Sequence, residues 1–478
     1  MMMMMYHRIG YLGLTICTLL LPWNVQSLPF KHSRQPESTD DIGNEMGIDS
    51  HPSSSNDWSA TVQNALQDLL DSNFHVNVRR ELHKTPELLF NEEETSASII
   101  RALESLNITN YSTGWGVNIH RDVFDGTGGY GVVVDIGTGK PPCVLLRADM
   151  DALPVLEETP VDFRSQNAGK MHACGHDGHS TMLLGAAGVL KRMEELGELD
   201  GTVRIMFQPA EEGGAGGKRM REEGVLSMYP PVEHAFAMHL WPTLGSGVIA
   251  GRPGALFAGA DAFELVVTGV GGHAAMPHLT VDPVVASSAI VLSLQSIVSR
   301  HLSPSESGVC SVTMIDAGET FNVIPSKVVL RGTIRALSTT LLLELQEKVK
   351  KISAAVAEAH GCSVNATFWR DYYPPTVNDA ELFDFVTGVA EDLSIDGKMT
   401  ITDPTMGAED FSFIAETVPS VFLFLGQGDA MNPPSHYGLH HPHFAIDEEV
   451  LPLGSRLHVE LALKTLEKLR REQSCDEI

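Results

Sequence analysis

Short apolar runs alternate with helical patterns after Tyr130, and this alternation restricts the possible folds more than any other feature of the sequence. Alternation of this kind is typical of a mostly parallel β-sheet with helices packed on it. A later apolar run, at 421–425, is expected to add a buried strand to the same sheet. The sequence therefore predicts an α/β domain, with strands at 131–136, 143–148, 202–207 and 235–238 and a helix at about 179–196.

The pattern changes between 253 and 370, where six predicted elements follow in the order β-α-β-β-α-β. That order fits a compact ferredoxin-like unit. A chain of 478 residues is longer than one core usually serves, so a second domain is expected. We interpret the segment as an α+β domain inserted into a larger one, which comprises 59–252 and 371–478. The expected elements of the insertion are strands 262–268, 308–315, 327–334 and 363–368, and helices 283–300 and 339–359.

The first 27 residues are typical of a signal peptide. His7 and Arg8 precede an apolar run at 9–23, and small residues before 28 suit cleavage after Ser27. The alternative is an uncleaved anchor, although a run of about 15 residues is short for a membrane span. The sequence thus predicts entry into the secretory pathway, to the ER lumen, the vacuole or the outside, with no integral membrane domain in the mature chain.

The next segment, 28–58, is rich in Ser, Asp, Asn and Pro and has few large apolar residues. Such a composition cannot offset the entropy of ordering the chain, so we interpret the segment as a disordered linker. The formal net charge of −28 argues against nucleic acid as a partner, because nucleic acid favours a basic surface. The six cysteines are dispersed, and their spacing indicates no disulfide framework.

The densest group of chemically active residues is Met171-His172-Ala173-Cys174-Gly175-His176-Asp177-Gly178-His179. Thiolate and imidazole are good ligands for zinc and similar ions, and the glycines let the backbone turn so that Cys174 and His176 converge. The alternative is a helix-capping turn with incidental histidines.

A second group, Glu211-Glu212, follows the predicted strand that ends at Phe207 after three intervening residues. Adjacent carboxylates at a strand end point in different directions, so one can bind a metal while the other acts as a base. A solvated surface pair is the ordinary interpretation of two adjacent glutamates. The position at the carboxyl end of an apolar strand favours a functional one.

Further metal-type residues recur in the same place. Asp149 and Asp151 follow the strand at 143–148, His239 follows the strand at 235–238, and His440 follows the strand at 421–425 after a loop. In open α/β sheets, ligands bind outside the carboxyl ends of the strands. His239 alone would be interpreted as a core histidine, but together these residues predict a metal site at one edge of the sheet.

These motifs resemble those of a known family, the metalloamidohydrolases that include aminoacylases and glutamate carboxypeptidases. The branch they resemble most contains plant auxin-conjugate amidohydrolases and bacterial hippurate hydrolases. The resemblance extends from about 60 to 469. It depends on the segments 147–154, 171–179, 209–213, 237–239, 271–277, 322–325 and 439–444.

The resemblance implies a pair of divalent metal ions, Mn²⁺ or Zn²⁺. It further implies that Glu211 is the general base and that Asp151 is a carboxylate that orients a ligand. The broader family usually has a histidine ligand where Asp149 stands and a bridging aspartate near Cys174. This sequence departs from that pattern, so Cys174 is the expected bridge and the identity of the metal is left open. The implied metal ligands are Cys174, His176, Glu212, His239 and His440.

The resemblance also implies a homodimer. In the family, a histidine on the inserted domain reaches into the site of the neighbouring subunit and stabilises the oxyanion, and His273 stands in the matching motif. The Gly271-Gly272 pair before it can also be interpreted as a plain strand-end turn. Asn322 and Arg335 match positions that contact the polar end of the substrate.

The sequence as a whole predicts a metal-dependent hydrolase of a small N-acylated amino acid, such as an auxin conjugate or a hippurate-like compound. A dipeptidase or carboxypeptidase with the same metals is one alternative. A catalytically silent metal-binding protein is another, although no expected ligand or base is missing. The acyl group is not predicted.

Overall fold

The computed structural model describes residues 58–394, 397–428 and 437–476. The predicted signal peptide at 1–27 and all but the last residue of the predicted linker at 28–58 lie outside the described residues. Both stay predictions, as do the boundaries 59–252, 253–370 and 371–478.

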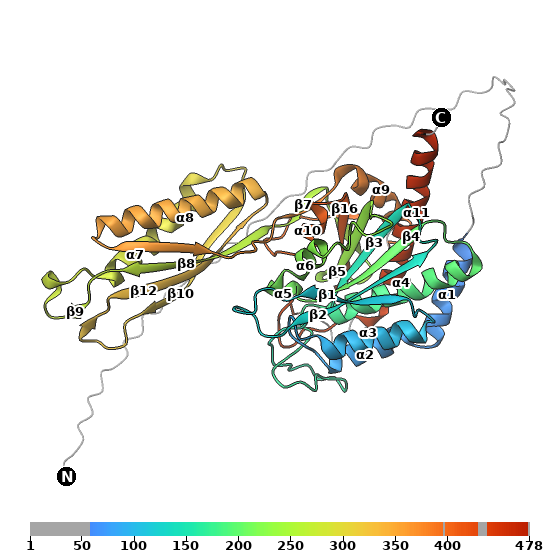
Figure 1. Ribbon diagram of the computed structural model, residues 1–478, viewed down its shortest axis with the longest axis horizontal. Coiled ribbons are helices and arrows are strands. Elements are labelled where there is room, and N and C mark those ends of the chain that lie inside the picture. Colours follow the sequence, from blue (N-terminus) through green and yellow to red (C-terminus); the bar gives the residue numbers. More distant parts are fainter. Residues whose placement is uncertain (1–57, 395–396, 429–436, 477–478) are drawn as a thin grey trace, which may run out of the picture. The chain divides into compact units, whose positions relative to one another are not determined.

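An eight-stranded sheet forms the centre of the larger domain (Figure 1). Its middle strands, β4, β3, β5 and β16, run parallel. β1 and β2 pair with their neighbours in antiparallel fashion, whereas β6 is antiparallel to β16 and parallel to β15. The predicted α/β fold with a mostly parallel sheet is confirmed. In sheet order the strands are β1 (Tyr111–Val117), β2 (Gly128–Gly137), β4 (Thr202–Gln208), β3 (Cys143–Asp149), β5 (His234–Gly245), β16 (Ser420–Gly428), β6 (Ile249–Gly251) and β15 (Thr400–Ile401).

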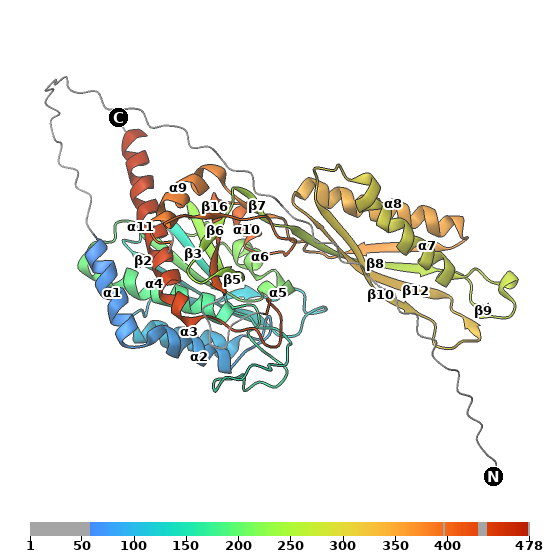
Figure 2. The same ribbon diagram turned by 180° about the vertical axis from the view of Figure 1, so that it is seen from behind.

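Helices cover both faces of this sheet. Successive side chains of a strand point to opposite faces, and in the buried strands both faces are apolar. In β2, Val132 and Val134 belong to the larger core and Val133 to a second core on the other face. Figure 2 shows the helices of the first face in front of the strands. The first face carries α1 (Ser59–Asp71), α2 (Phe74–Lys84), α3 (Glu93–Ser105), α4 (His176–Leu196), α9 (Ala380–Glu391) and α11 (Leu451–Asp476), and the second carries α6 (Gly216–Glu222) and α10 (Ser412–Ala415).

Helix α4 begins at His176, three residues before the expected start at 179. Gly175 precedes it with a φ of 99°, a left-handed conformation that favours glycine. Asp177 lies in the first turn, where a carboxylate interacts favourably with the helix dipole. His176 and His179 are therefore helical residues three apart and lie on the same side of α4.

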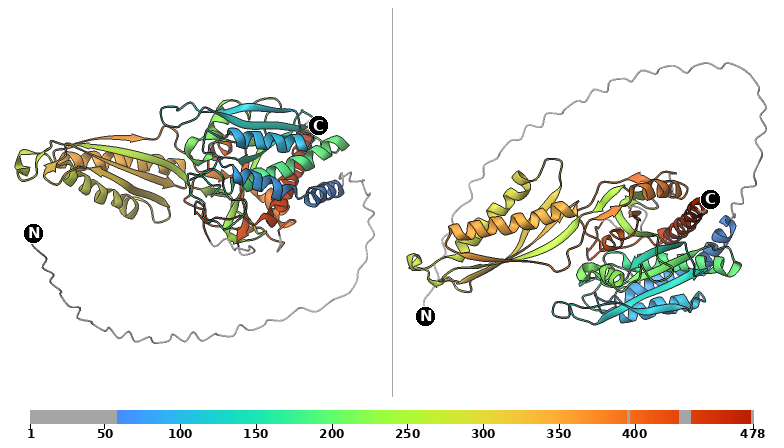
Figure 3. Two further views of the ribbon diagram at one scale, coloured as in Figure 1. Left: turned by 90° about the horizontal axis from the view of Figure 1, so that it is seen from below. Right: turned by 45° about the horizontal axis from the view of Figure 1, so that its top comes forward.

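The inserted domain has its own antiparallel sheet, in the order β10-β12-β8-β13, with two helices on it (Figure 3). Leu265, Ile290, Leu330 and Leu345 belong to a core that contains no residue of the larger domain's sheet. The predicted ferredoxin-like insertion is confirmed. Its elements are β8 (Gly259–Thr268), α7 (Pro283–Ser296), β10 (Gly308–Ala317), β12 (Lys327–Ala336), α8 (Thr339–Ala359) and β13 (Ser363–Phe368).

Within the described residues, one helix, 283–301, is long and apolar enough to cross a membrane. Ile290 and Leu294 of this helix are fully buried in the core of the inserted domain, whereas Leu292 is 75% exposed. Packing on a sheet thus accounts for only part of its apolar surface.

Buried histidines make the stability of the larger domain depend on pH. His75 of α2 is 3% exposed, and its Nε2 lies 2.9 Å from the Oγ of Ser455 in α11. Because the Ser455 hydroxyl donates to the carbonyl oxygen of Met182, it accepts from the Nε2–H of His75. Burial lowers the pKa of His75 from 6.5 to about 4.

We expect His75→Gln to weaken the loss of stability in mild acid. Between pH 6.5 and about pH 4 the unfolded chain binds a proton at His75 that the folded chain excludes, so stability falls as the pH falls through this range. Glutamine can donate to Ser455 but cannot take up this proton. Thermal midpoints of metal-free protein from pH 7 to pH 4 test this, with exposed His301→Gln as the control. Parallel curves for His75→Gln and the parent would contradict the expectation.

Candidate metal centre and active site

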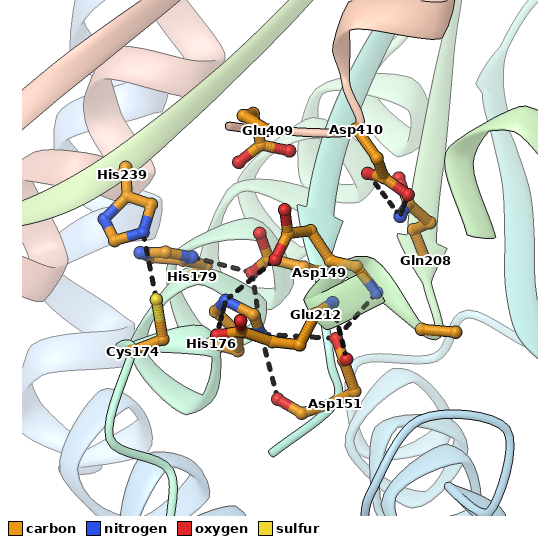
Figure 4. Close-up of polar contacts among 12 residues, drawn as sticks. Asp149, Asp151, Cys174, His176, His179, Gln208, Glu212, His239, Glu409 and Asp410 are labelled. Carbon is orange, nitrogen blue, oxygen red and sulfur yellow. Dashed lines mark hydrogen bonds and ion pairs between the residues drawn. The ribbon is translucent and has the colours of Figure 1, made fainter. Parts of the chain in front are cut away.

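The predicted site lies at the carboxyl edge of the parallel strands. Strand β3 ends at Asp149 and β4 at Gln208, while His239 lies in β5 beside Phe424 of β16. Because these strands are parallel neighbours, their polar residues converge at one edge of the sheet (Figure 4).

The five predicted metal ligands form one cluster. The Sγ atom of Cys174 lies 3.4 Å from His239 Nε2 and 3.3 Å from His440 Nε2. Glu212 Oε1 lies 3.1 Å from His440 Nε2 and 4.0 Å from His176 Nε2. Overlapping groups of three, each with its donor atoms within 4.8 Å of one another, connect all five residues.

Two histidines of the cluster bind a backbone carbonyl oxygen through Nδ1. His176 Nδ1 lies 2.9 Å from the carbonyl oxygen of Asp151, and His239 Nδ1 lies 2.8 Å from that of Leu240. A carbonyl accepts only from N–H, so Nδ1 carries the proton and Nε2 faces the cluster. Histidines that bind metals are usually held in this way.

The residues present fit divalent cations. His176 Nε2 and Glu212 Oε1 are buried and have no hydrogen-bond partner, although buried polar atoms are almost always paired. Burial opposes charge on His176, but Asp149 and Asp151 raise its pKa to about 10, so a cation would replace a proton there. Thiolate, imidazole and carboxylate together suit zinc and manganese.

Strained backbone holds the fifth donor in place. His440 has a φ of 64°, which non-glycine residues rarely adopt, and its backbone N–H donates to the carbonyl oxygen of Ala173, 2.7 Å away. This bond ties the loop of His440 to the segment that carries Cys174.

Asp151 contacts the predicted base and two predicted ligands. Its two carboxylate oxygens each accept a backbone N–H, from Glu211 and from Glu212, both at 3.0 Å. Its Oδ1 also lies 3.3 Å from His176 Nδ1. One carboxylate thus fixes the positions of the predicted base, Glu211, and of two predicted ligands, Glu212 and His176.

Glu211, the predicted base, is 6% exposed. Burial, and then the neighbouring carboxylate of Glu409, raise the pKa of Glu211 well above its ordinary value. Its backbone is fixed by Tyr373, whose hydroxyl donates to the carbonyl oxygen of Glu211 and accepts from Ala215 N–H, both at 2.8 Å. A carboxylate with a raised pKa binds a proton more strongly and is a better base.

The sequence motifs contained a supporting residue, His179, to which no role was given. His179 Nδ1 lies 2.7 Å from Asp149 Oδ1, and His179 Nε2 accepts the N–H of Leu240 at 2.9 Å. His179 is therefore neutral, and it fixes the backbone of β5 next to His239. If the helix had been predicted to begin at His176, the spacing of three residues would have placed His179 on the same side. The predicted helix began at 179, so this relation was missed.

A buried arginine connects three segments of the site. Arg147 Nε donates to Gln208 Oε1, Nη1 donates to Asp149 Oδ2, and Nη2 donates to Asp410 Oδ1, each at 2.8 Å. Arg147 Nη2 also lies 3.0 Å from Glu409 Oε1. Sequence reasoning missed the Glu409-Asp410 pair, because two adjacent carboxylates were its only signal and, unlike Glu211-Glu212, it does not follow a predicted strand.

A pocket of about 1140 Å³ opens on the cluster. Cys174, Glu211 and Glu409 line it, together with aromatic side chains and Arg335. His273 and Asn322 are not among its lining residues. Both lie near the short β9 (Gly272–His273) and β11 (Val323–Ile324) ladder of the inserted domain, where Ala274 N–H donates to the carbonyl oxygen of Asn322.

A family model described as peptidase family M20/M25/M40 matches residues 145–464. The chain belongs to this family. Among M20 relatives, it is 45% identical to IAA-amino acid hydrolase ILR1-like 2 of Arabidopsis thaliana, over 82% of this chain and 85% of that one. It is 35% identical to N-acetylcysteine deacetylase of Bacillus subtilis, over 84% of this chain and 100% of that one. The predicted hydrolase class is therefore confirmed.

Two solved structures have a similar fold. A dinuclear metal-binding M20 peptidase of Bacillus subtilis has a TM-score of 0.68 and 33% identity, over 83% of this chain and 99% of that one. A Staphylococcus aureus aminohydrolase has a TM-score of 0.75 and the same identity, over 85% and 99%. Dinuclear metal binding thus occurs in the family, and this chain supplies donors for it.

We expect Cys174→Ser to lower metal content far more than stability. A serine hydroxyl is a much weaker ligand than a thiolate, whereas its size is similar. Metal analysis after gel filtration and circular dichroism of the same samples test this. Cys362→Ser, at a buried cysteine of the inserted domain, is the control and should keep its metal. Full metal occupancy in Cys174→Ser would refute a ligand role for Cys174.

Proposed function

We propose that this chain hydrolyses the amide bond of small N-acylated amino acids, such as auxin–amino acid conjugates or hippurate-like compounds. The observation that carries the proposal is the buried carboxylate of Glu211, which lines the same pocket as four of the five metal-type donors, Cys174, Glu212, His239 and His440. The relatives named for hydrolysis of IAA-amino acids and for deacetylation of N-acetylcysteine support the reaction class.

Cys174, His176, Glu212, His239 and His440 would hold two divalent cations, Mn²⁺ or Zn²⁺, which would lower the pKa of a water molecule and polarise the amide carbonyl. A Glu211 carboxylate oxygen takes a proton from the attacking water and later gives it to the amide nitrogen. Asp151 keeps Glu211 in position by binding its backbone N–H.

The pocket offers an apolar wall and a cation for the two ends of such a substrate. Trp241 lies against His239 and stacks on Phe424 at a centroid distance of 4.1 Å, with Phe257 across its edge. These rings suit an aromatic acyl group. Arg335 forms no ion pair with any described residue and is free to bind the carboxylate of the amino acid.

A carboxypeptidase is the second candidate. The chain is 37% identical to thermostable carboxypeptidase 2 of Saccharolobus solfataricus, over 81% of this chain and 94% of that one. The two functions differ in the group on the acyl side of the bond. A panel of hippurate, indole-acetyl amino acids and free dipeptides distinguishes them, because only a peptidase needs or tolerates a free α-amine there.

The assembly that supports this reaction is a homodimer joined through the inserted domain. Exposed apolar side chains gather on that domain: Leu292 is 75% exposed, Leu279 68% and Phe321 99%. Patches of this kind favour association. His273 would then act in the partner's site, and Asn322 would contact the polar end of the substrate. The signal peptide at 1–27 supports a secretory location, which the N-terminus of the mature protein would test.

We expect Glu211→Gln to keep its metal and to lower kcat by about 10²-fold to 10⁴-fold, the usual effect of losing a general base. Glutamine has the same shape but cannot take up the proton. Glu212→Gln is the contrast and should lose metal as well as activity. Initial rates are measured on an N-acyl amino acid that the wild-type protein hydrolyses, and the metal content of each sample is measured as well. Near-normal turnover by metal-loaded Glu211→Gln would contradict the assignment.

We expect two inactive variants, His273→Ala and Glu211→Ala, to restore activity when their subunits exchange. In a mixed dimer, one site combines an intact Glu211 with an intact His273 from the other chain, so that site works if His273 acts across the interface. Activity should reach up to about half of the wild-type level. If differently tagged subunits form mixed dimers and these stay inactive, His273 does not act in trans.

A further inference from the structure

Glu409 is a buried carboxylate of the active-site pocket that the reaction described above does not use. It is 2% exposed and lies in the loop before α10, and it lines the same pocket as Glu211. In Figure 4 its carboxylate points toward the metal-type residues. A buried carboxylate is costly unless each oxygen has a partner, so both oxygens need an explanation.

One oxygen has partners within the protein. Glu409 Oε1 lies 3.0 Å from Arg147 Nη2 and accepts the N–H of Phe411 at 3.0 Å. Glu409 Oε2 accepts no hydrogen bond from the described residues. The carboxylate is thus fixed through one oxygen, and the other is left for a donor that enters the pocket.

The need to neutralise Arg147 does not account for Glu409. Gln208, Asp149 and Asp410 already occupy Nε, Nη1 and Nη2 of the guanidinium. Three carboxylates, with that of Glu409 included, therefore surround one cation. The Oε2 atom of Glu409 accepts from none of the described residues and belongs to a side chain that lines the pocket, so it favours a positively charged donor of the substrate or product.

The distance between Glu409 and Glu211 fits an ammonium group. One carboxylate oxygen of Glu409 lies within 4.8 Å of a carboxylate oxygen of Glu211. A tetrahedral ammonium that donates two hydrogen bonds of about 2.8 Å spans acceptors about 4.6 Å apart. We propose that Glu409 Oε2 binds the nitrogen of the leaving amino acid and stabilises it as it becomes an ammonium. This inference depends on the proposed amide hydrolysis.

The step balances as follows. Water gives its hydroxyl to the acyl carbon and one proton to Glu211, and the carbon–nitrogen bond breaks. The nitrogen takes the proton of Glu211 and then that of the new carboxylic acid, so acylate and ammonium are formed. Glu409 exchanges no proton and supplies a charge-assisted hydrogen bond that strengthens as the nitrogen gains positive charge.

The test compares two leaving groups in metal-loaded enzyme. One substrate is an N-acyl amino acid, and the other is the matching ester with the same acyl group and an α-hydroxy acid in place of the amino acid. We expect Glu409→Gln to lower kcat for the amide about tenfold to a hundredfold more than kcat for the ester, because the ester releases no ammonium. Equal losses on both substrates would overturn the proposal.

Asp410→Asn is the matched control, since it removes the neighbouring negative charge from the same arginine. Asp410 is bonded to Arg147, Gln208 and the N–H of Gly217, so its loss should affect amide and ester alike. If Glu409→Gln does not fold, Glu409→Asp is used in its place, because it keeps the charge but moves the carboxylate oxygens back from the pocket. It should still lower the ratio of kcat for the amide to kcat for the ester, by a smaller factor than that expected for Glu409→Gln.

A second readout needs no catalysis. Inhibition by the product amino acid is compared with inhibition by its α-hydroxy acid, and Glu409→Gln should weaken only the former. An unchanged preference for the amino acid would count against Glu409. A wild-type protein that hydrolyses neither amide nor ester would instead refute the proposed function.

Discussion

The site depends on the buried guanidinium of Arg147. It binds Asp149 at the end of its own strand, Gln208 at the end of the next strand, and Asp410 from a loop 263 residues later in the chain. A buried cation is stable only when it is closely paired, so these segments cannot separate without leaving charges unpaired. Arg147 thereby also fixes Glu211, which comes three residues after Gln208, and Glu409, which directly precedes Asp410.

Much of this site was predictable because the parallel sheet imposes a simple rule. Polar residues that directly follow apolar strands meet at one edge, so Asp151, Glu211 and His239 could be brought together before any coordinates were known. Cys174 and His176 were predictable for another reason, since thiol and imidazole two residues apart beside glycine have few roles other than metal binding. The fold class followed from the same apolar runs.

Glu409 and His179 were missed because their roles depend on contacts that the sequence does not contain. The partner of Glu409 is Arg147, which is 262 residues away, and two adjacent acids are otherwise typical of a surface. The role of His179 depends on which atoms surround each ring nitrogen. The early start of α4 arises from the left-handed backbone of Gly175, which a periodic pattern of apolar residues cannot reveal.

The distribution of charge also explains why the site suits hydrolysis of an amide. Asp149, Glu409 and Asp410 contact Arg147, and Asp151, Glu211 and Glu212 lie in the same site, so the site is rich in carboxylates. Cys174, His239 and His440 would hold cations on one side of the site, and these would relieve repulsion among the carboxylates. They would leave the carboxylates on the opposite side to face the nitrogen of the bond. The attacking hydroxyl would therefore be bound by cations, and the departing amine would face carboxylates. Both groups are held in fixed positions by the same fold.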